Sequence, residues 1–397
     1  MSNIGTLGAV IAADILLKHP HVHLVCLVRG NTAVSAHDRL MGCISQALGV
    51  SCMSAVHQHR VTSITGFLSE ECFGIPEDVY ESLVSDVDSI IHCAAAVNHV
   101  QTYEWHKAAN VCGTLRVIEM ACSARRKGLL PINLISTANV TSDLLSGTTV
   151  GDDSHSTRFT LLQGLNGYTM SKLGAEMLCK EAARHGCEVR VFRPGICTSH
   201  SHNGFCKTTD FYPRLLVAML KERIYPTISG DATFDMTPVD YVAHGINHII
   251  LNPPAAATVP TMKSNNDLSH PSIQYYHPIS AKHEVGFDVL VDGVRLYLNE
   301  VVAMGVGVGP SLRPTSDLTE LPFAEFQKQM SHVDYFAPIK HELRSGGRPV
   351  VRNCDKTLWA QALDSLLDMQ HLQGTLIPAS EVTPAAVKKC IDFIVRA

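Results

Sequence analysis

The sequence has few charged residues, no closely paired cysteines and no long apolar run. Charged residues make up 17% of the chain and the net charge at pH 7 is −5, so neither nucleic acid nor a membrane is an expected partner. No basic stripe with interleaved aromatic residues is present. The early apolar segment LGAVIAADILL contains Asp14, is too short to cross a bilayer and has no basic segment before it. These absences leave an ordinary globular protein, which we expect in the cytoplasm.

Cysteine and histidine are both frequent, but neither forms a motif of known chemistry. The 13 cysteines are scattered singly, with no CxxC pair. This odd number is typical of reduced thiols in a cytosolic chain rather than of a disulfide framework. The 21 histidines include two clusters, HPHVH at 19–23 and HSH at 200–202. The first has no carboxylate or cysteine placed nearby to complete a ligand set, and we predict no metal site.

The first half of the chain alternates apolar runs of strand length with helical patterns. The predicted strands are VHLVCLVR, RVTSITG, VDSIIHCAA, PINLIST and CEVRVFRPG. Helices are predicted between them, the longest at 166–186. This alternation is typical of parallel strands joined by crossover helices. The predicted fold class is therefore α/β, with a doubly wound parallel sheet of the Rossmann type.

The second half is less regular. A helix is predicted at 210–222, and the polar stretch at 262–282 shows no periodic element. At 397 residues the chain is long enough for two or three domains, or for one large domain with a cap. We predict a Rossmann domain at 1–200, to which 230–252 returns, and a smaller, mainly helical cap at 201–397.

The segment GYTMSKLGAE carries the strongest local signal. It places Tyr168 and Lys172 four residues apart on a predicted helix, so both side chains lie on one face. An ammonium near a phenol favours the phenolate, and the tyrosine can then exchange a proton with a substrate oxygen. This spacing also arises by chance in many helices. However, the preceding strand ends in Ser136 and Thr137, at the sheet edge where ligands bind, and RPG follows the next strand.

This order of a strand-end hydroxyl, a YxxxK helix and RPG resembles an extended short-chain dehydrogenase/reductase. More narrowly, the chain resembles the thioester reductase domains of peptide synthetases, aminoadipate reductases and carboxylic acid reductases. The resemblance spans residues 2–250 and rests on segments in family order: GTLGA, CLVRG, IIHCAAAVNHV, ANVCGT, ISTANV, GYTMSK, VFRPG and TPVDYVAHGI. It implies an NADP(H)-dependent reductase of acyl thioesters that releases an aldehyde or, after a second hydride transfer, an alcohol. The acyl group would arrive on the phosphopantetheine of an acyl carrier protein or on coenzyme A.

The resemblance also implies a role for each catalytic residue. Thr137 would donate a hydrogen bond to the substrate carbonyl, Tyr168 would protonate the developing alkoxide, and Lys172 would hold the ribose and lower the tyrosine pKa. Arg29 ends the second family strand, where an acidic residue usually marks NAD, so it favours NADP. Arg29 is alternatively a solvated charge at a strand end.

Further cofactor contacts are implied at the glycine loop, at strand ends and in ANVCGT. The small residues of HCAAAV serve tight packing equally well. The implied cofactor residues besides Arg29 are Gly5, Thr6, Leu7, Gly8, Arg39, Phe67, Leu68, Ala94, Ala95, Ala96, Asn110, Ser136, Pro194 and Gly195.

The sequence departs from the family pattern at the cofactor loop. A buried strand and another glycine precede GTLGA in the family, whereas Ser2 stands here at the glycine position and the first strand is missing. We interpret the chain as truncated at this end, which leaves two unpaired strand edges. Phe67 also replaces a family aspartate that meets the adenine. The alternatives are therefore an extended reductase of another carbonyl or alcohol substrate, and a non-catalytic truncated paralogue.

Overall fold

The chain divides into two compact units. The computed structural model describes residues 5–30, 32–49, 58–124, 128–141, 166–228, 233–253, 273–280, 282, 284–304, 317–330, 333 and 381–396. Within these residues, the first unit holds Met1–Gly195 and Ala243–Pro278, and the second holds Ile196–Val242, Ile279–Pro349 and Ile377–Ala397. The division into a Rossmann domain at 1–200 with 230–252 and a cap at 201–397 stays a prediction.

The first unit is built on parallel strands, as the sequence predicts. Its four-stranded sheet has the order β3-β4-β5-β9, with β3 (Ile90–His92), β4 (Ile132–Ile135), β5 (Val189–Phe192) and β9 (Gln274–Tyr276). A separate parallel pair consists of β1 (Leu24–Val28) and β2 (Val61–Thr65). Strands β4 and β5 are buried along their whole length, as is typical of interior strands of a parallel sheet. The predicted α/β fold class is confirmed.

The parallel strands of the first unit form two separate described sheets. Among the described strands, β1 pairs with β2 alone, and β3 pairs with β4 alone. Burial raises the pKa of the Cys93 thiol, just after β3, to about 12; the charge of Lys172 opposes this rise and Cys26 on β1 adds to it. No described ladder joins β1 to β3.

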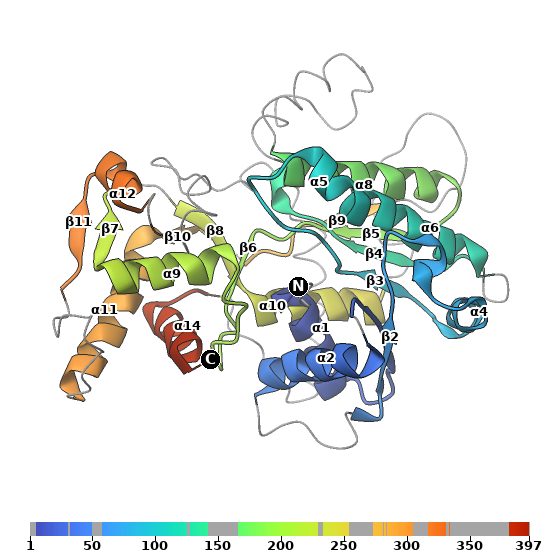
Figure 1. Ribbon diagram of the computed structural model, residues 1–397, viewed down its shortest axis with the longest axis horizontal. Coiled ribbons are helices and arrows are strands. Elements are labelled where there is room, and N and C mark those ends of the chain that lie inside the picture. Colours follow the sequence, from blue (N-terminus) through green and yellow to red (C-terminus); the bar gives the residue numbers. More distant parts are fainter. Residues whose placement is uncertain are drawn as a thin grey trace, which may run out of the picture. The chain divides into compact units, whose positions relative to one another are not determined.

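Helices cover both faces of the four-stranded sheet, which makes the unit doubly wound. Figure 1 shows α5, α6 and α8 on one face and α1 and α10 on the other. The helical elements are α1 (Thr6–Lys18), α2 (Ala33–Leu48), η1 (Glu71–Gly74), α4 (Glu77–Asp86), α5 (Tyr103–Lys107), the π-helical turn η2 (Ala108–Cys112), α6 (Gly113–Ser123), η3 (Ala138–Thr141), α8 (Gly167–Arg184) and α10 (Val239–Leu251). The predicted helix at 166–186 is thus confirmed as α8.

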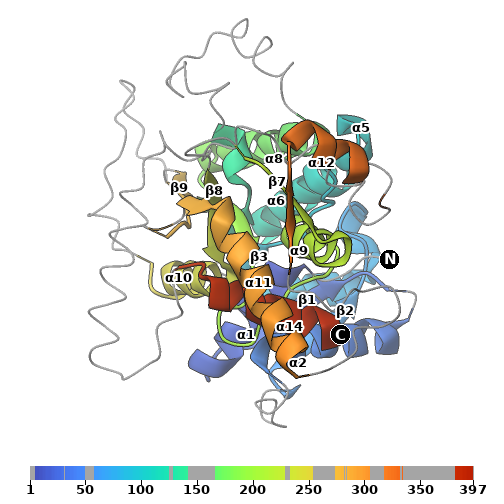
Figure 2. The same ribbon diagram turned by 90° about the vertical axis from the view of Figure 1, so that its left-hand side faces the viewer.

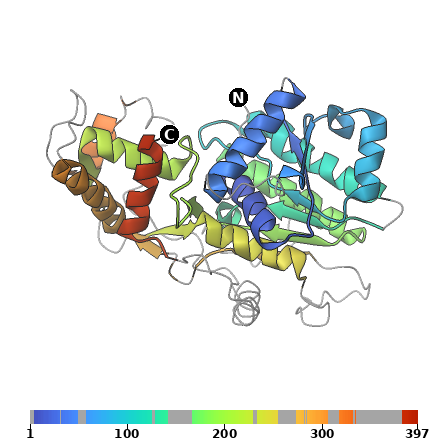
Figure 3. The ribbon, with the colours of Figure 1, turned by 90° about the horizontal axis from the view of Figure 1, so that it is seen from below.

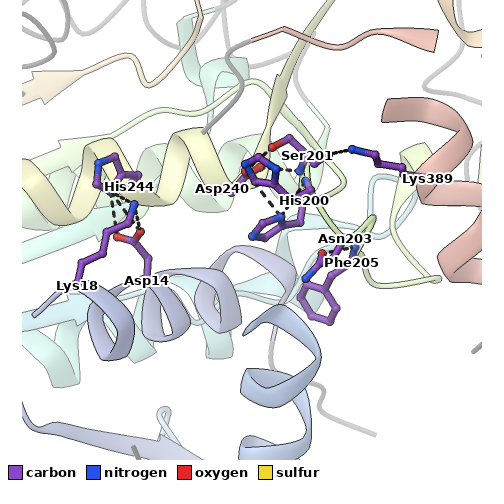
Figure 4. Close-up of polar contacts among 10 residues, drawn as sticks. Asp14, Lys18, His200, Ser201, Asn203, Phe205, Asp240, His244 and Lys389 are labelled. Atoms are coloured by element: carbon purple, nitrogen blue, oxygen red, sulfur yellow. Dashed lines mark hydrogen bonds and ion pairs between the residues drawn. The ribbon is translucent and has the colours of Figure 1, made fainter. Parts of the chain in front are cut away.

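A buried polar cluster joins α1 to the part of α10 that belongs to the first unit. Figure 3 shows the two helices side by side, and Figure 4 shows Asp14 and Lys18 facing His244. The Asp14 carboxylate lies 2.8 Å from Lys18 Nζ and 3.2 Å from His244 Nδ1 and accepts a 2.9 Å hydrogen bond from Asn247. Burial alone would raise the pKa of Asp14, but His244 and Lys18 hold it well below its usual range. The cluster fixes the cofactor-loop helix α1 to α10.

The second unit is mixed, with short strands and four further helices among its described residues. Figure 2 shows α14 lying against α11. Gly293 permits this approach, because a Cβ there would lie 2.3 Å from the Val387 side chain of α14. Its described elements are β6 (Ile196–Thr198), α9 (Phe211–Glu222), β7 (Ile224–Pro226), β8 (Thr233–Pro238), β10 (Glu284–Gly286), α11 (Phe287–Ala303), β11 (Thr319–Leu321), α12 (Phe323–Met330) and α14 (Pro384–Arg396).

The sequence reading was wrong at 262–282. Strand β9 lies within this stretch and pairs with β5 from Arg190↔Gln274 to Phe192↔Tyr276. A three-residue strand is too short to show a period of two, so only its pairing with β5 defines it. In the part of the chain that is described, every helix is too short or too polar to span a bilayer.

Candidate active site

The carboxyl ends of three neighbouring parallel strands place the predicted catalytic segment at one sheet edge. Strands β3, β4 and β5 are adjacent and parallel, so the segments that follow them emerge on the same side. The amide of Ala138 donates a 2.8 Å hydrogen bond to Pro194 O, which joins the segments after β4 and β5. Thr137 lies next to this contact, and its Oγ1 accepts a 3.3 Å hydrogen bond from Asn139 N.

Helix α8 presents Tyr168 and Lys172 on one buried face. Its N-cap is Asn166, whose Oδ1 accepts a 2.8 Å hydrogen bond from Thr169 N. Tyr168 is 8% exposed and Lys172 is 3% exposed. Lys172 Nζ donates a 2.6 Å hydrogen bond to Ile135 O at the end of β4. Burial lowers the pKa of Lys172 to about 8, so the side chain is mainly an ammonium at neutral pH.

Asn110 links α8 to the segment after β3. Its side chain accepts a 2.7 Å hydrogen bond from Ala96 N and donates to Ala96 O at 3.0 Å and to Ser171 Oγ at 2.8 Å. Asn110 lies in the π-helical turn η2 between α5 and α6, and such turns are frequent at functional sites. The structure therefore brings together two predicted cofactor residues, Asn110 and Ala96, beside the helix that carries Tyr168.

The hydroxyl of Ser136 has an internal partner. It donates a 2.5 Å hydrogen bond to Glu176, one helical turn after Lys172, and Glu176 forms a buried bidentate ion pair with Arg193 at 2.6 and 3.0 Å. The Arg193 guanidinium also lies 4.3 Å from the centre of the Tyr275 ring. Sequence reasoning missed this network, although the i,i+4 spacing of Lys172 and Glu176 is a detectable signal. A cofactor contact of Ser136 stays a prediction.

Two histidines that sequence reasoning also missed flank Tyr168. The His99 ring lies 5.2 Å and the His106 ring 5.8 Å from the tyrosine ring, both edge to face. His106 is fully buried, and its Nδ1 and Nε2 lie 3.0 Å from Ala96 O and 2.8 Å from Asn98 O. His99 lies within the segment IIHCAAAVNHV and His106 outside any quoted segment, but only the tertiary contacts place either ring against Tyr168.

Another histidine, the buried His92, stands at the end of β3. Its Nε2 lies 3.0 Å from Thr114 Oγ1, whose proton is donated to Asn110 O at 2.7 Å. Because a hydroxyl has only one proton, His92 must be the donor to Thr114 and carries its proton on Nε2. Burial, and secondly the charge of Lys172, lower the pKa of His92 to about 3, so this ring is neutral.

The start of α1 fits the phosphates of a dinucleotide. Gly5 is the N-cap, and Thr6 and Leu7 form the first turn, where backbone N–H groups lack partners within the helix. Within the described part of the chain, no atom lies within 4 Å of a Cβ added to Gly5, and one added to Gly8 would lie 3.6 Å from the Cys93 side chain. A pyrophosphate can therefore approach the backbone at Gly5, while Gly8 lies against the segment leading to Ala94 and Ala95.

The remaining predicted cofactor residues follow β1 and β2. Arg29 is exposed at the end of β1, and the Arg39 guanidinium donates a hydrogen bond to Arg29 O. The side chain of Phe67 is 43% exposed, whereas Leu68 contacts the position of Gly113, where an added Cβ would lie 2.8 Å from it. The two arginines are thus brought together, and Phe67 has an accessible ring. Their contacts with a cofactor stay predictions.

Because Gly167 has no side chain, the start of α8 can lie close to the backbone of residues 101–103. A Cβ at this position would lie 2.4 Å from Thr102 C and 2.5 Å from Gln101 O. We expect Gly167→Ala to lower the free energy of unfolding by about 1–3 kcal/mol through overpacking and to displace the adjacent Tyr168. Urea unfolding and NADPH-dependent turnover measure both effects.

The control for this substitution is Gly42→Ala in α2, where no atom lies within 4 Å of an added Cβ. There we expect stability to rise by about 0.5–1 kcal/mol, because alanine has the higher helix propensity. Equal effects of the two alanine substitutions would contradict the packing argument.

Comparison with known proteins places the chain in a family. The family of NAD-binding domains described as male sterility protein matches residues 4–246. Aldehyde reductase lnbA of Aspergillus flavus is 30% identical over 247 residues, which are 62% of this chain and 24% of that protein. The L-2-aminoadipate reductase large subunit of Penicillium chrysogenum is 28% identical over 299 residues, which are 72% of this chain and 20% of that protein. The chain thus spans about a quarter or less of the length of these curated relatives.

A solved structure shows the same fold. The terminal R domain from the myxalamid PKS-NRPS biosynthetic pathway matches with a TM-score of 0.72 at 24% identity, covering 98% of this chain and 88% of that one. The family match covers more than half of the 397 residues and includes the α1 start, the strand-end segments and α8. The chain therefore belongs to the male sterility protein family of NAD-binding domains, a reductase family whose members take a nicotinamide cofactor.

Proposed function

We propose that this protein is an NADPH-dependent reductase of acyl thioesters, which releases an aldehyde and a thiol. The observation that carries the proposal is the placement of Tyr168 and Lys172 on one buried face of α8, with Lys172 bound to the end of β4 beside Thr137. Two of the relatives, an aldehyde reductase and an aminoadipate reductase, support this reaction class.

The three proposed catalytic side chains would act on the carbonyl oxygen of the thioester and on the proton that it receives. The α1 start and Arg29 would hold NADPH, which would supply the hydride for the thioester carbonyl carbon. Thr137 Oγ1 donates a hydrogen bond to the carbonyl oxygen, and Tyr168 Oη gives its proton to that oxygen as negative charge develops there. The resulting hemithioacetal loses the thiol and leaves the aldehyde. The Lys172 ammonium favours the phenolate that Tyr168 becomes.

The carrier of the acyl group is the second part of the proposal. We propose a phosphopantetheine thioester, on an acyl carrier protein or on coenzyme A. Purified protein would be given NADPH with acyl-coenzyme A, an acyl-loaded carrier protein and a simple ketone, and the aldehyde would be trapped as a hydrazone. Turnover of the thioesters but not of the ketone is expected. Turnover of the ketone alone would favour a reductase of another carbonyl substrate.

A binding measurement distinguishes a working reductase from a non-catalytic paralogue. Titration with NADPH, followed by nicotinamide fluorescence, is expected to show binding at micromolar concentrations. Binding without turnover of any substrate would favour a binding protein that keeps the fold. Absence of binding at high micromolar NADPH would contradict the reductase proposal outright.

Arg29 is expected to select NADPH over NADH. Its side chain is exposed at the end of β1, and Arg39 donates to its carbonyl oxygen, which supports the proposal that both cations would meet a 2′-phosphate. Loss of a charge-assisted hydrogen bond costs about 1.5–3 kcal/mol, so Arg29→Ala should weaken NADPH binding at least about tenfold. NADH binding should stay unchanged.

Arg184→Ala is the matched control, because this arginine is exposed on α8 and paired with Glu181. It should bind both cofactors as the unsubstituted protein does. Equal weakening of NADPH and NADH in Arg29→Ala would contradict a role for Arg29 in recognising the 2′-phosphate.

A further inference from the structure

The fully buried His106 lies between the proposed proton donor and the segment after β3. Its ring contacts the Tyr168 ring edge to face at 5.8 Å. Its two nitrogens each lie within hydrogen-bond distance of a backbone carbonyl, Ala96 O at 3.0 Å and Asn98 O at 2.8 Å. The same imidazole therefore contacts both the tyrosine and the backbone that Asn110 binds at Ala96.

The two hydrogen-bond partners of the His106 ring are both acceptors, so they require two N–H donors. A neutral imidazole has one N–H donor and one acceptor nitrogen, yet two carbonyl oxygens, which only accept, face this ring. A neutral ring would leave a nitrogen lone pair against a carbonyl oxygen in a buried site, which is unfavourable. The ring satisfies both carbonyls only when it carries a proton on each nitrogen.

We propose that His106 is a positioning residue of the reduction, which holds the 96–98 backbone and the Tyr168 ring in place by donating a hydrogen bond from each ring nitrogen. The inference rests on the proposed function, because Tyr168 is the proton donor of that reaction. It adds a residue that does not touch the substrate but fixes the group that does.

The neighbouring His99 ring is neutral. Burial, and secondly the charge of His106, lower the pKa of His99 to about 4. Glu104 and Lys107 on the same helix as His106 are largely exposed, and Lys107 Nζ lies 3.8 Å from Glu104 Oε2. Besides His99, the titratable side chains on the elements packed against α5 are Cys112 on η2 and Tyr168, Lys172, Glu176, Cys179, Lys180, Glu181 and Arg184 on α8. Those on α5 itself, besides His106, are Tyr103, Glu104 and Lys107.

The test compares two variants of His106 with one control. His106→Leu removes both donors, whereas His106→Gln keeps an amide that can donate to a carbonyl. A misplaced catalytic group can cost about a hundredfold in rate, so His106→Leu should lower kcat by about that factor while KM and the Kd for NADPH stay unchanged. His106→Gln should recover much of the loss. The control is His185→Leu, an exposed position at the end of α8, which should leave kcat unchanged.

Several results would overturn the inference. One is a kcat for His106→Leu within about threefold of the unsubstituted protein, far from the expected loss. Another is an equal loss in both variants that follows the folded fraction in urea, which would indicate a purely structural role. A purely structural role would produce neither the recovery of activity in His106→Gln nor a lower kcat with an unchanged KM in His106→Leu.

Nitrogen NMR of the unsubstituted protein tests the donor count without any substrate. Ring ¹⁵N shifts at pH 7 that show both His106 nitrogens protonated support the inference, and shifts that show one bare nitrogen overturn it. If the protein reduces no thioester, the proposed function fails by the turnover assay, while the NMR result still decides the state of His106. The two failures are therefore distinguishable.

Discussion

Replacing Tyr168 by phenylalanine is expected to lower kcat for thioester reduction about a thousandfold, within the range for loss of a general acid. The substitution removes only the hydroxyl. The ring remains and keeps its edge-to-face contacts with His99 and His106, so the fold and the Lys172 contact with Ile135 O should be unchanged. NADPH binding should stay within about twofold, because the lost oxygen acts on the transition state rather than on the cofactor.

The measurement is single-turnover reduction of an acyl thioester under NADPH, with fluorescence titration of the cofactor as the companion assay. Tyr80→Phe in α4, a half-buried tyrosine of the same unit, is the matched control and should retain full turnover. Retention of more than about a tenth of the activity by Tyr168→Phe would refute the tyrosine as proton donor. Loss of NADPH binding instead would show that the hydroxyl acts in the cofactor site.

The second large predicted effect is a lower free energy of unfolding when the pH falls from 7 to 5. Burial and the charge of Lys172 lower the pKa of His92 to about 3, and burial and the charge of His106 lower that of His99 to about 4. Both groups stay neutral in the fold, while in the unfolded chain they take up a proton near pH 6.5. The stabilisation is therefore complete above pH 6.5 and is lost as the pH falls toward the folded-state pKa values.

The size of this effect follows from linkage. Between pH 7 and pH 5 each of the two histidines lowers the free energy of unfolding by about 2 kcal/mol, so together they cost about 4 kcal/mol. His19 and His248, whose pKa values burial also lowers, add to the loss in the same direction. Asp14 contributes only at lower pH, because its pKa is held below its usual range.

Urea unfolding at pH 7 and pH 5 measures this loss. His92→Gln keeps an amide donor for Thr114 and should reduce the difference between the two pH values by about 2 kcal/mol. His185→Gln, at an exposed histidine, should leave the difference unchanged. A stability that is equal at both pH values would show that His92 and His99 are not neutral in the fold.

The local part of the candidate site is readable from the sequence. Tyr168 and Lys172 are one helical turn apart, so any helix through them places both on one face, and α8 does so. Thr137 follows an apolar strand, and parallel strands end at a common edge, so its place beside β5 is also predictable. These features depend on periods of two and 3.6 residues within short segments.

The partners of these residues are not readable in the same way. Ser136 reads as a strand-end hydroxyl open to a cofactor, yet it donates to Glu176, 40 residues later in the chain. Asn110 reads as a helical position, yet the π-helical turn directs its amide to Ala96 and Ser171. In both cases a side chain has several possible partners, and the packing of helices on the sheet selects one.

The sequence by itself determined the α/β class, the order of five strands and the helical face that carries Tyr168, because each follows from spacing within a few residues. Only the tertiary structure decided that β9 adds to β5, that β1 and β3 are left on separate sheets, and that His106 lies against Tyr168. These contacts join residues that are distant along the chain, and apolar packing, which is not directional, brings them together. No local pattern records them, so the environment of the proposed proton donor emerges only in the folded chain.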